Sequence, residues 1–147
     1  MPKILFTTSS FDLNNFEARE ELSNKGYHFL VNPYQKRLTE DQVDELLTDD
    51  VVGMVAGLEP LTRRVLENAK GLKVIARCGI GMDNVNLIAA KEMGISVFNT
   101  PDAPTRAVAE LTLAHILSLC RRITESDANL RNSKWSPLMG RLLAMFM

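Results

Sequence analysis

The sequence has little of what several specialised classes of protein need. Its 147 residues contain two cysteines, Cys78 and Cys120, which lie far apart and fit no metal-binding spacing. Such sparse cysteine does not indicate a secreted disulfide scaffold, and a reducing, cytoplasmic setting is the simplest expectation. The formal net charge is −1, so no overall positive field would draw the chain onto nucleic acid or an anionic membrane.

Long apolar runs and targeting signals are also missing. The first residues, MPKILFTTSS, lack the length and the apolar core of a signal peptide. The most apolar helical stretch, Ala107 to Cys120, contains Glu110 and His115 and falls short of the roughly 20 apolar residues that span a bilayer. Neither a membrane nor nucleic acid is therefore expected as a partner. The sequence shows no internal repeat and no low-complexity segment.

What the chain does contain is an alternation of strand and helix patterns. Thr39, with Gln42 three positions later, predicts a capping box at the start of one helix. The patterns predict strands at 3–8, 27–31, 51–57, 72–76 and 95–99, and helices at 15–26, 39–47, 61–69 and 84–93. This order, with its short connections, predicts an α/β fold: a doubly wound parallel sheet of five strands with helices on both faces.

The character of the sequence changes near residue 100. Pro104 stands where a helix can begin, and a long helical pattern runs from about Thr105 to about Glu125. Apolar residues nearly surround this helix, so it is expected to pack against another domain, another subunit, or both. We therefore predict a lobe at 1–100, followed at 101–147 by a turn, the long helix and the start of another domain. The apolar ending LLAMFM predicts either a docked tail or a chain cut before its next element.

The segment RCGIGMDN, Arg77 to Asn84, resembles half of a dinucleotide-binding loop. Gly79 and Gly81 supply the first two glycines of the fingerprint, but Asn84 occupies the third position. No acidic residue stands at the end of the next strand, which reads VFNT, and no other phosphate-loop motif occurs in the chain. The loop is therefore not expected to hold a pyrophosphate.

The same loop has the chemistry of a carboxylate site. It leaves the carboxyl end of a buried strand, where open α/β sheets bind ligands. The N–H groups of Gly79, Ile80 and Gly81 could face a small anion, and Arg77 adds a full positive charge. A helix beginning at Asn84, with Asp83 as its cap, would add partial positive charge. The alternative is a simple glycine turn with Arg77 in a surface ion pair.

The sequence offers few other candidates for catalytic residues. His28 lies within a strand pattern and His115 on the apolar helix, and both are expected to be structural. Cys78 could be a reactive thiol, but no histidine is near it in sequence to act as a base. Glu110 is expected to form a salt bridge across an interface. No paired acids and no metal-ligand cluster appear, so no catalytic residue and no metal site are assigned.

Residues 72–123 resemble the N-terminal half of the D-isomer-specific 2-hydroxyacid dehydrogenases, and most of all the phosphoglycerate dehydrogenase type. The shared motifs are R-x-G-x-G-x-D-N at 77–84, G-I-x-V-x-N-T-P at 94–101 and A-E-L at 109–111. Trp135, after the letters NSK, also matches a tryptophan common in the family. The resemblance is weaker, but continuous in layout, from residue 3 to residue 71.

The resemblance implies two flavodoxin-like or Rossmann-like lobes with a cleft between them. The first lobe would bind a 2-hydroxy or 2-oxo acid and the second NAD or NADP. It assigns substrate binding to Arg77, Cys78, Gly79, Ile80 and Gly81, and places Ile80, Ala103 and Thr105 beside the cofactor. The helix at 105–124 would form a homodimer interface, which would account for its apolar surface.

In the family, the G-x-G-x-x-G loop and the catalytic arginine, glutamate and histidine all come later than residue 147. We therefore expect the N-terminal part of an enzyme that transfers a hydride between NAD(P) and a D-2-hydroxy acid, such as 3-phosphoglycerate or a related acid. This part alone is expected to be inactive. The alternative is a non-catalytic carboxylate-binding or dimerisation module of the same fold. A receiver-like signalling domain is disfavoured, because Asp12 alone stands where such a domain clusters acids around Mg²⁺.

Overall fold

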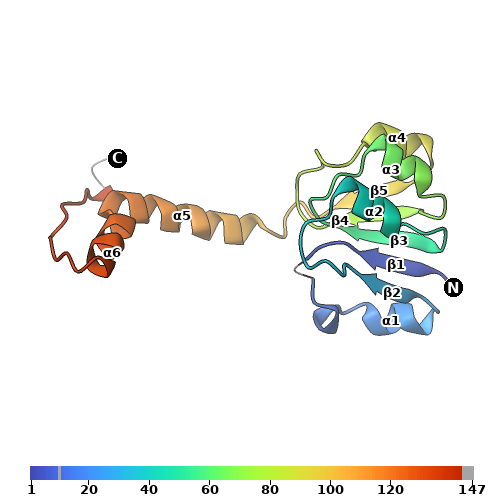
Figure 1. Ribbon diagram of the computed structural model, residues 1–147, viewed down its shortest axis with the longest axis horizontal. Coiled ribbons are helices and arrows are strands. Elements are labelled where there is room, and N and C mark those ends of the chain that lie inside the picture. The colour runs from blue at the N-terminus through green and yellow to red at the C-terminus, as the bar shows by residue number, and fades with distance from the viewer. Residues whose placement is uncertain (10, 144–147) are drawn as a thin grey trace. The chain divides into compact units, whose positions relative to one another are not determined.

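The chain folds as two compact units. The computed structural model describes residues 1–9 and 11–143. The first unit comprises residues 1–102, and the second begins at Ala103. The first contains a parallel sheet with flanking helices, as the sequence predicts (Figure 1). The substrate-binding role of the first unit remains a prediction from the sequence. The second unit as the start of a cofactor-binding lobe likewise remains a prediction.

The sheet of the first unit has five parallel strands in the order β2-β1-β3-β4-β5. They are β1 (Lys3–Phe6), β2 (His28–Val31), β3 (Val51–Ala56), β4 (Val74–Arg77) and β5 (Ser96–Asn99). The register aligns Leu5, Met54, Ile75 and Val97 across neighbouring strands. Paired residues point to the same face of the sheet, so these apolar side chains form the part of the hydrophobic core that the sheet contributes.

Three helices cover that face of the sheet: α2 (Glu40–Leu46), α3 (Arg63–Asn68) and α4 (Leu87–Glu92) (Figure 1). Their buried residues Val43, Val65, Leu66, Ala89 and Ala90 pack into the same cluster as the strands. The predicted capping box at the start of α2 is confirmed, because Thr39 and Gln42 bond reciprocally to each other's main chain.

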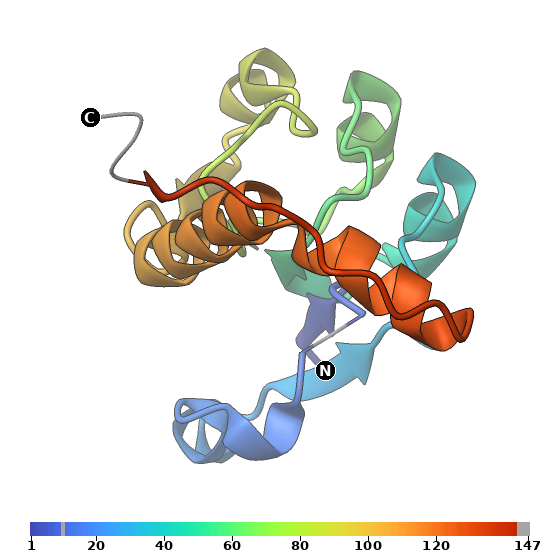
Figure 2. The same ribbon diagram turned by 90° about the vertical axis from the view of Figure 1, so that its left-hand side faces the viewer.

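The opposite face is covered by aromatic residues and short helices. The 3-10 helix η1 (Leu13–Asn15) and α1 (Arg19–Asn24) belong to this side, and Figure 2 shows α1 (blue) across the sheet from α2 (cyan), α3 (green) and α4 (yellow). The rings of Phe6, Phe11, Phe16 and Phe29 form a cluster with centroid separations from 4.7 to 6.3 Å. Phe6 is fully buried within it. This cluster therefore closes the half of the sheet that contains β1 and β2.

The start of α4 differs from the sequence expectation. The helix begins at Leu87, not at Asn84, and its cap is Asn86 rather than Asp83. Asn86 accepts a hydrogen bond from the N–H of Ala89. Asp83 and Asn84 instead lie in a turn, and Val85 after them forms a parallel bridge with Leu61. The predicted helix start at Asn84 and cap at Asp83 were therefore wrong, and the helix N-terminus lies three residues further along the chain from the glycine loop than expected.

The second unit contains α5 (Thr105–Arg121) and α6 (Ile123–Arg131). The single long helix expected from 105 to 125 was wrong, since Arg122 adopts the left-handed conformation, with φ of 53°, between the two. Within the unit the chain returns to α5, where the N–H of Arg141 donates to the carbonyl of Cys120 over 2.7 Å. α5 has no buried residue. Across residues 1–9 and 11–143, no helix combines the length and apolarity needed to cross a membrane.

Candidate functional site

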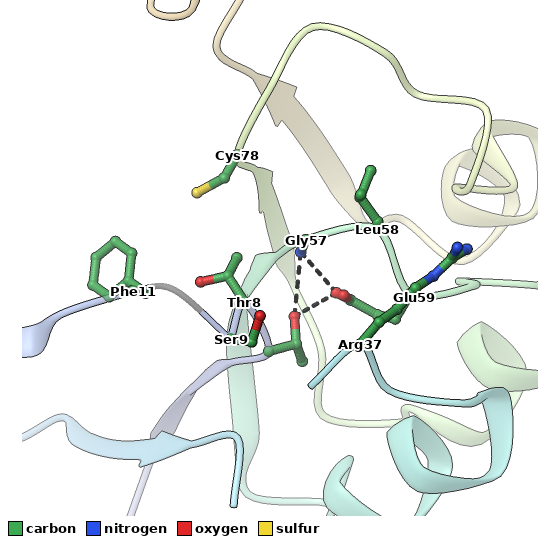
Figure 3. A pocket seen from close by; sticks show the side chains of 9 residues that line it. Thr8, Ser9, Phe11, Arg37, Gly57, Leu58, Glu59 and Cys78 are labelled. Carbon is green, nitrogen blue, oxygen red and sulfur yellow. Dashed lines mark hydrogen bonds between the residues drawn. The ribbon is translucent and has the colours of Figure 1, made fainter. Parts of the chain in front are cut away.

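The strand order creates a crevice at the carboxyl edge of the sheet. The chain passes from β1 to β2 on one side, whereas β3 lies on the other side of β1. Open α/β sheets bind ligands at such a switch point, outside the carboxyl ends of the strands. A cavity of about 310 Å³ lies here in the first unit (Figure 3). Its lining residues follow β1, β3 and β4 or come from nearby loops: Thr7, Thr8, Ser9, Phe11, Arg37, Gly57, Leu58, Glu59 and Cys78.

A buried carboxylate forms part of this cavity wall. Glu59 is 1% exposed. Its Oε1 accepts a hydrogen bond from the N–H of Gly57 over 2.8 Å and another from the hydroxyl of Thr7 (Figure 3). In the part of the chain that the structure describes, no lysine, arginine or histidine nitrogen lies within 4.0 Å of it. Glu59 is therefore a desolvated acid stabilised by hydrogen bonds instead of by an ion pair.

Arg77 lies beneath the glycine loop. It is 8% exposed, and its guanidinium donates to the carbonyl of Cys78. Gly79 has φ of +132°, and a Cβ on it would lie 1.6 Å from Nη1 of Arg77. No carboxylate lies within 4.0 Å of this guanidinium among the described residues, and its buried Nε has no hydrogen-bond partner there. The alternative of a surface ion pair at Arg77 was therefore wrong.

The end of β5 fixes the path of the glycine loop. The N–H of Gly79 donates to Oγ1 of Thr100 over 2.7 Å, and the amide of Asn99 donates to the carbonyl of Ile80 over 2.8 Å. Gly79 thus has an acceptor inside the protein. The N–H groups of Ile80 and Gly81 have none within residues 1–9 and 11–143. Both residues are exposed, so two of the three expected amides are available to a ligand.

Asn84 joins the glycine loop to the cavity wall. Its Nδ2 donates to the carbonyl of Glu59 over 2.7 Å and to that of Gly57 over 3.2 Å. The sequence interpretation missed this role, as well as those of Thr7 and Glu59. The one signal in the sequence was the acid in GLEP, which follows directly after a buried strand at the edge where ligands bind.

The remaining candidates contribute less. Partial burial raises the pKa of the Cys78 thiol, partly offset by Arg77 and reinforced by Glu59, which disfavours the nucleophilic thiolate. His28 and His115 are exposed. Ala103 and Thr105, the expected cofactor contacts, belong to the second unit, and Thr105 is the first residue of α5. No group of three or more metal-ligating side chains occurs within the described ranges.

Comparison with known proteins identifies the family. The family model described as D-isomer specific 2-hydroxyacid dehydrogenase, catalytic domain, matches residues 5–137. The chain is 42% identical over 98 residues to D-3-phosphoglycerate dehydrogenase of Methanocaldococcus jannaschii, a match that covers 67% of the chain and 19% of that protein. It is 37% identical over 119 residues to hydroxypyruvate reductase of Thermotoga maritima, covering 81% and 38%. The structure of the TT0316 protein from Thermus thermophilus matches with a TM-score of 0.79 and 31% identity, over 95% of this chain and 45% of that one.

The chain therefore belongs to the D-isomer-specific 2-hydroxyacid dehydrogenase family. Within that family its similarity is to the phosphoglycerate dehydrogenase type, as the sequence motifs indicate. The chain spans less than half the length of each of these relatives.

Proposed function

We propose that this chain is the substrate-binding part of a dehydrogenase that acts on a D-2-hydroxy acid, 3-phosphoglycerate or a related acid, or on the matching 2-oxo acid. Family membership supports the reaction class. The observation that carries the proposal is the loop at the carboxyl end of β4. There the N–H groups of Ile80 and Gly81 have no acceptor among the described residues, and the buried Arg77 has no carboxylate partner within 4.0 Å. Amide donors next to a desolvated guanidinium stabilise a carboxylate.

The proposed hydride carrier is NAD or NADP. A nicotinamide supplies hydride transfer when it is held against the substrate carbon with an acid–base partner. The glycine loop does not fit the pyrophosphate of such a cofactor. Asn84 replaces the third glycine of the fingerprint, and the N–H of Gly79 already donates to Oγ1 of Thr100. Contacts to the cofactor are proposed for Ile80, Ala103 and Thr105 on the strength of the resemblance alone. Because Cys78 and Cys120 are free, we place the protein in a reducing compartment, the cytoplasm.

Two measurements on the purified chain test this proposal. In a ¹H–¹⁵N titration with D-glycerate, we expect the amides of Ile80 and Gly81 to shift most, because their N–H groups would gain an acceptor. The amides of Gly26 and Gly94, which lie at turns away from the loop, serve as internal controls. Addition of NAD⁺ or NADP⁺ with the same acid should give no turnover. Unmoved Ile80 and Gly81 amides would reject the carboxylate site, and measurable turnover would reject the expected inactivity.

We also propose that a second copy of the chain covers α5. Within the second unit the helix has no buried residue, and Val108, Leu111 and Leu113 are each 57% exposed. Apolar surface on most faces of a helix is typical of an interface. Light scattering should report a dimer, and Leu113→Glu should convert it to a monomer, whereas Ala128→Glu on α6 should not. A monomeric unmodified chain would contradict the proposal.

A further inference from the structure

We propose that the cavity beside Glu59 receives the substrate beyond its carboxylate, and that Glu59 selects an uncharged, hydroxyl-bearing tail over a phosphorylated one. This inference rests on the proposed function, since it assumes that the carboxylate binds at residues 77–81, and among the acids proposed there it favours those without a phosphate over 3-phosphoglycerate. It makes Glu59 a specificity-determining residue and not a catalytic one.

The cavity and the glycine loop meet at Cys78. This residue directly precedes Gly79, and its side chain lines the cavity (Figure 3). We place the rest of an acid held by the N–H groups of Ile80 and Gly81 in this cavity, which is bounded by the loops that follow β1 and β3. The volume of about 310 Å³ lies at the small end for ligand sites, which suits a short-chain acid.

One side of the cavity is rich in hydroxyl groups. Thr7, Thr8 and Ser9 follow β1 in sequence, and all three line the cavity. The hydroxyl of Thr7 is committed to Glu59, but the buried Oγ1 of Thr8 has no hydrogen-bond partner among the described residues. A buried polar group without a partner is costly, and a hydroxyl on the ligand would satisfy it.

The charge of Glu59 works against an anionic tail. Its carboxylate is 1% exposed and has no cation within 4.0 Å in the described part of the chain. Like charges repel far more strongly in such a desolvated site than in water. A phosphate group carries about −1.5 to −2 at neutral pH, so placing one in this cavity adds a repulsion that a neutral hydroxyl group does not meet.

Arg37 is the other charged residue in the lining, and its charge has the opposite sign. Its side chain is exposed, whereas Glu59 is buried. Solvent and salt screen an exposed charge strongly and a buried one much less. The field inside the cavity is therefore set mainly by Glu59.

The test compares two acids that differ only in the phosphate. The ¹⁵N-labelled chain is titrated with D-glycerate and with D-3-phosphoglycerate, and the shifts of Ile80 and Gly81 report binding. We expect D-glycerate to bind at least about tenfold more tightly. Glu59→Gln keeps an oxygen acceptor for Gly57 and Thr7 but removes the charge, so the preference should fall by about fivefold or more. Glu20→Gln, on exposed α1, changes the net charge equally and should leave the preference intact.

Each other outcome overturns one part of the proposal. If both acids shift Ile80 and Gly81 but D-3-phosphoglycerate binds equally or better, the selection by Glu59 is wrong and the carboxylate site stands. If Arg37→Gln then abolishes the tighter binding of D-3-phosphoglycerate, Arg37 is the residue that binds the phosphate. If Glu59→Gln gives a native spectrum with an unchanged preference, Glu59 is not the determinant. If neither acid moves the two amides, the proposed function itself fails.

Discussion

Gly79→Ala is expected to destabilise the first unit by about 2–4 kcal/mol and to disrupt the carboxylate loop. The backbone φ of +132° is one that residues with a side chain rarely adopt, and the new Cβ would lie 1.6 Å from Nη1 and 2.8 Å from Cζ of Arg77. Arg77 is 8% exposed, so its guanidinium has little room to move and would lose its hydrogen bond to the Cys78 carbonyl. Urea unfolding of both proteins measures the cost.

Gly81→Ala is the matched control for this experiment. The nearest atom to its added Cβ is Oδ2 of Asp83 at 3.5 Å, an ordinary van der Waals contact, and its φ is not positive. We expect a change below about 1 kcal/mol. Equal costs at Gly79 and Gly81 would show that neither the backbone conformation nor the contact with Arg77 constrains the loop.

Phe6→Ala is expected to cost about 3–5 kcal/mol of unfolding free energy. Phe6 is fully buried, and its ring lies 4.7 Å from that of Phe11, 5.4 Å from that of Phe16 and 5.8 Å from that of Phe29, centroid to centroid. Alanine would leave a cavity in the cluster that covers β1 and β2, and would remove the edge-to-face contacts with Phe16 and Phe29. Thermal and urea unfolding should both report the loss.

Phe98→Ala provides the comparison, because the strand register places Phe98 on the same face of the sheet as Phe6. Phe98 is 61% exposed, so its removal should change stability by less than about 1 kcal/mol. If Phe98→Ala destabilised the chain as much as Phe6→Ala, the aromatic cluster could not be the main closure of that face.

The elements that the sequence predicts well are those whose determinants are local. The strand patterns and the Thr39–Gln42 capping box depend on residues a few positions apart, and all of them appear in the structure. The start of α4 depends instead on the bridge between Val85 and Leu61, which no local pattern encodes. Arg122, which ends α5, is neither glycine nor proline, so the break between α5 and α6 carries no ordinary sequence signal.

The candidate site likewise has parts that the local sequence predicts and parts that depend on the whole fold. The glycine loop is recognisable from its motif, and its position after β4 follows from the strand pattern. The hydrogen bond between Thr7 and Glu59 joins residues 52 positions apart, and it forms because β1 and β3 are neighbours in the sheet. Strand order is a property of the whole fold. Glu59 therefore becomes a candidate only once the three-dimensional structure is known.

The hydrogen bonds of Asn84 bear on how such a site can change over evolutionary time. Both acceptors, at Gly57 and Glu59, are main-chain carbonyls, which every amino acid carries. The loop between β3 and α3 therefore keeps this anchor whatever side chain stands at position 58, whereas replacing Glu59 would also remove the acceptor of the Gly57 N–H and the Thr7 hydroxyl. Leu58 lines the cavity and is 58% exposed, so a residue that faces a ligand can change while the main-chain framework under it is retained.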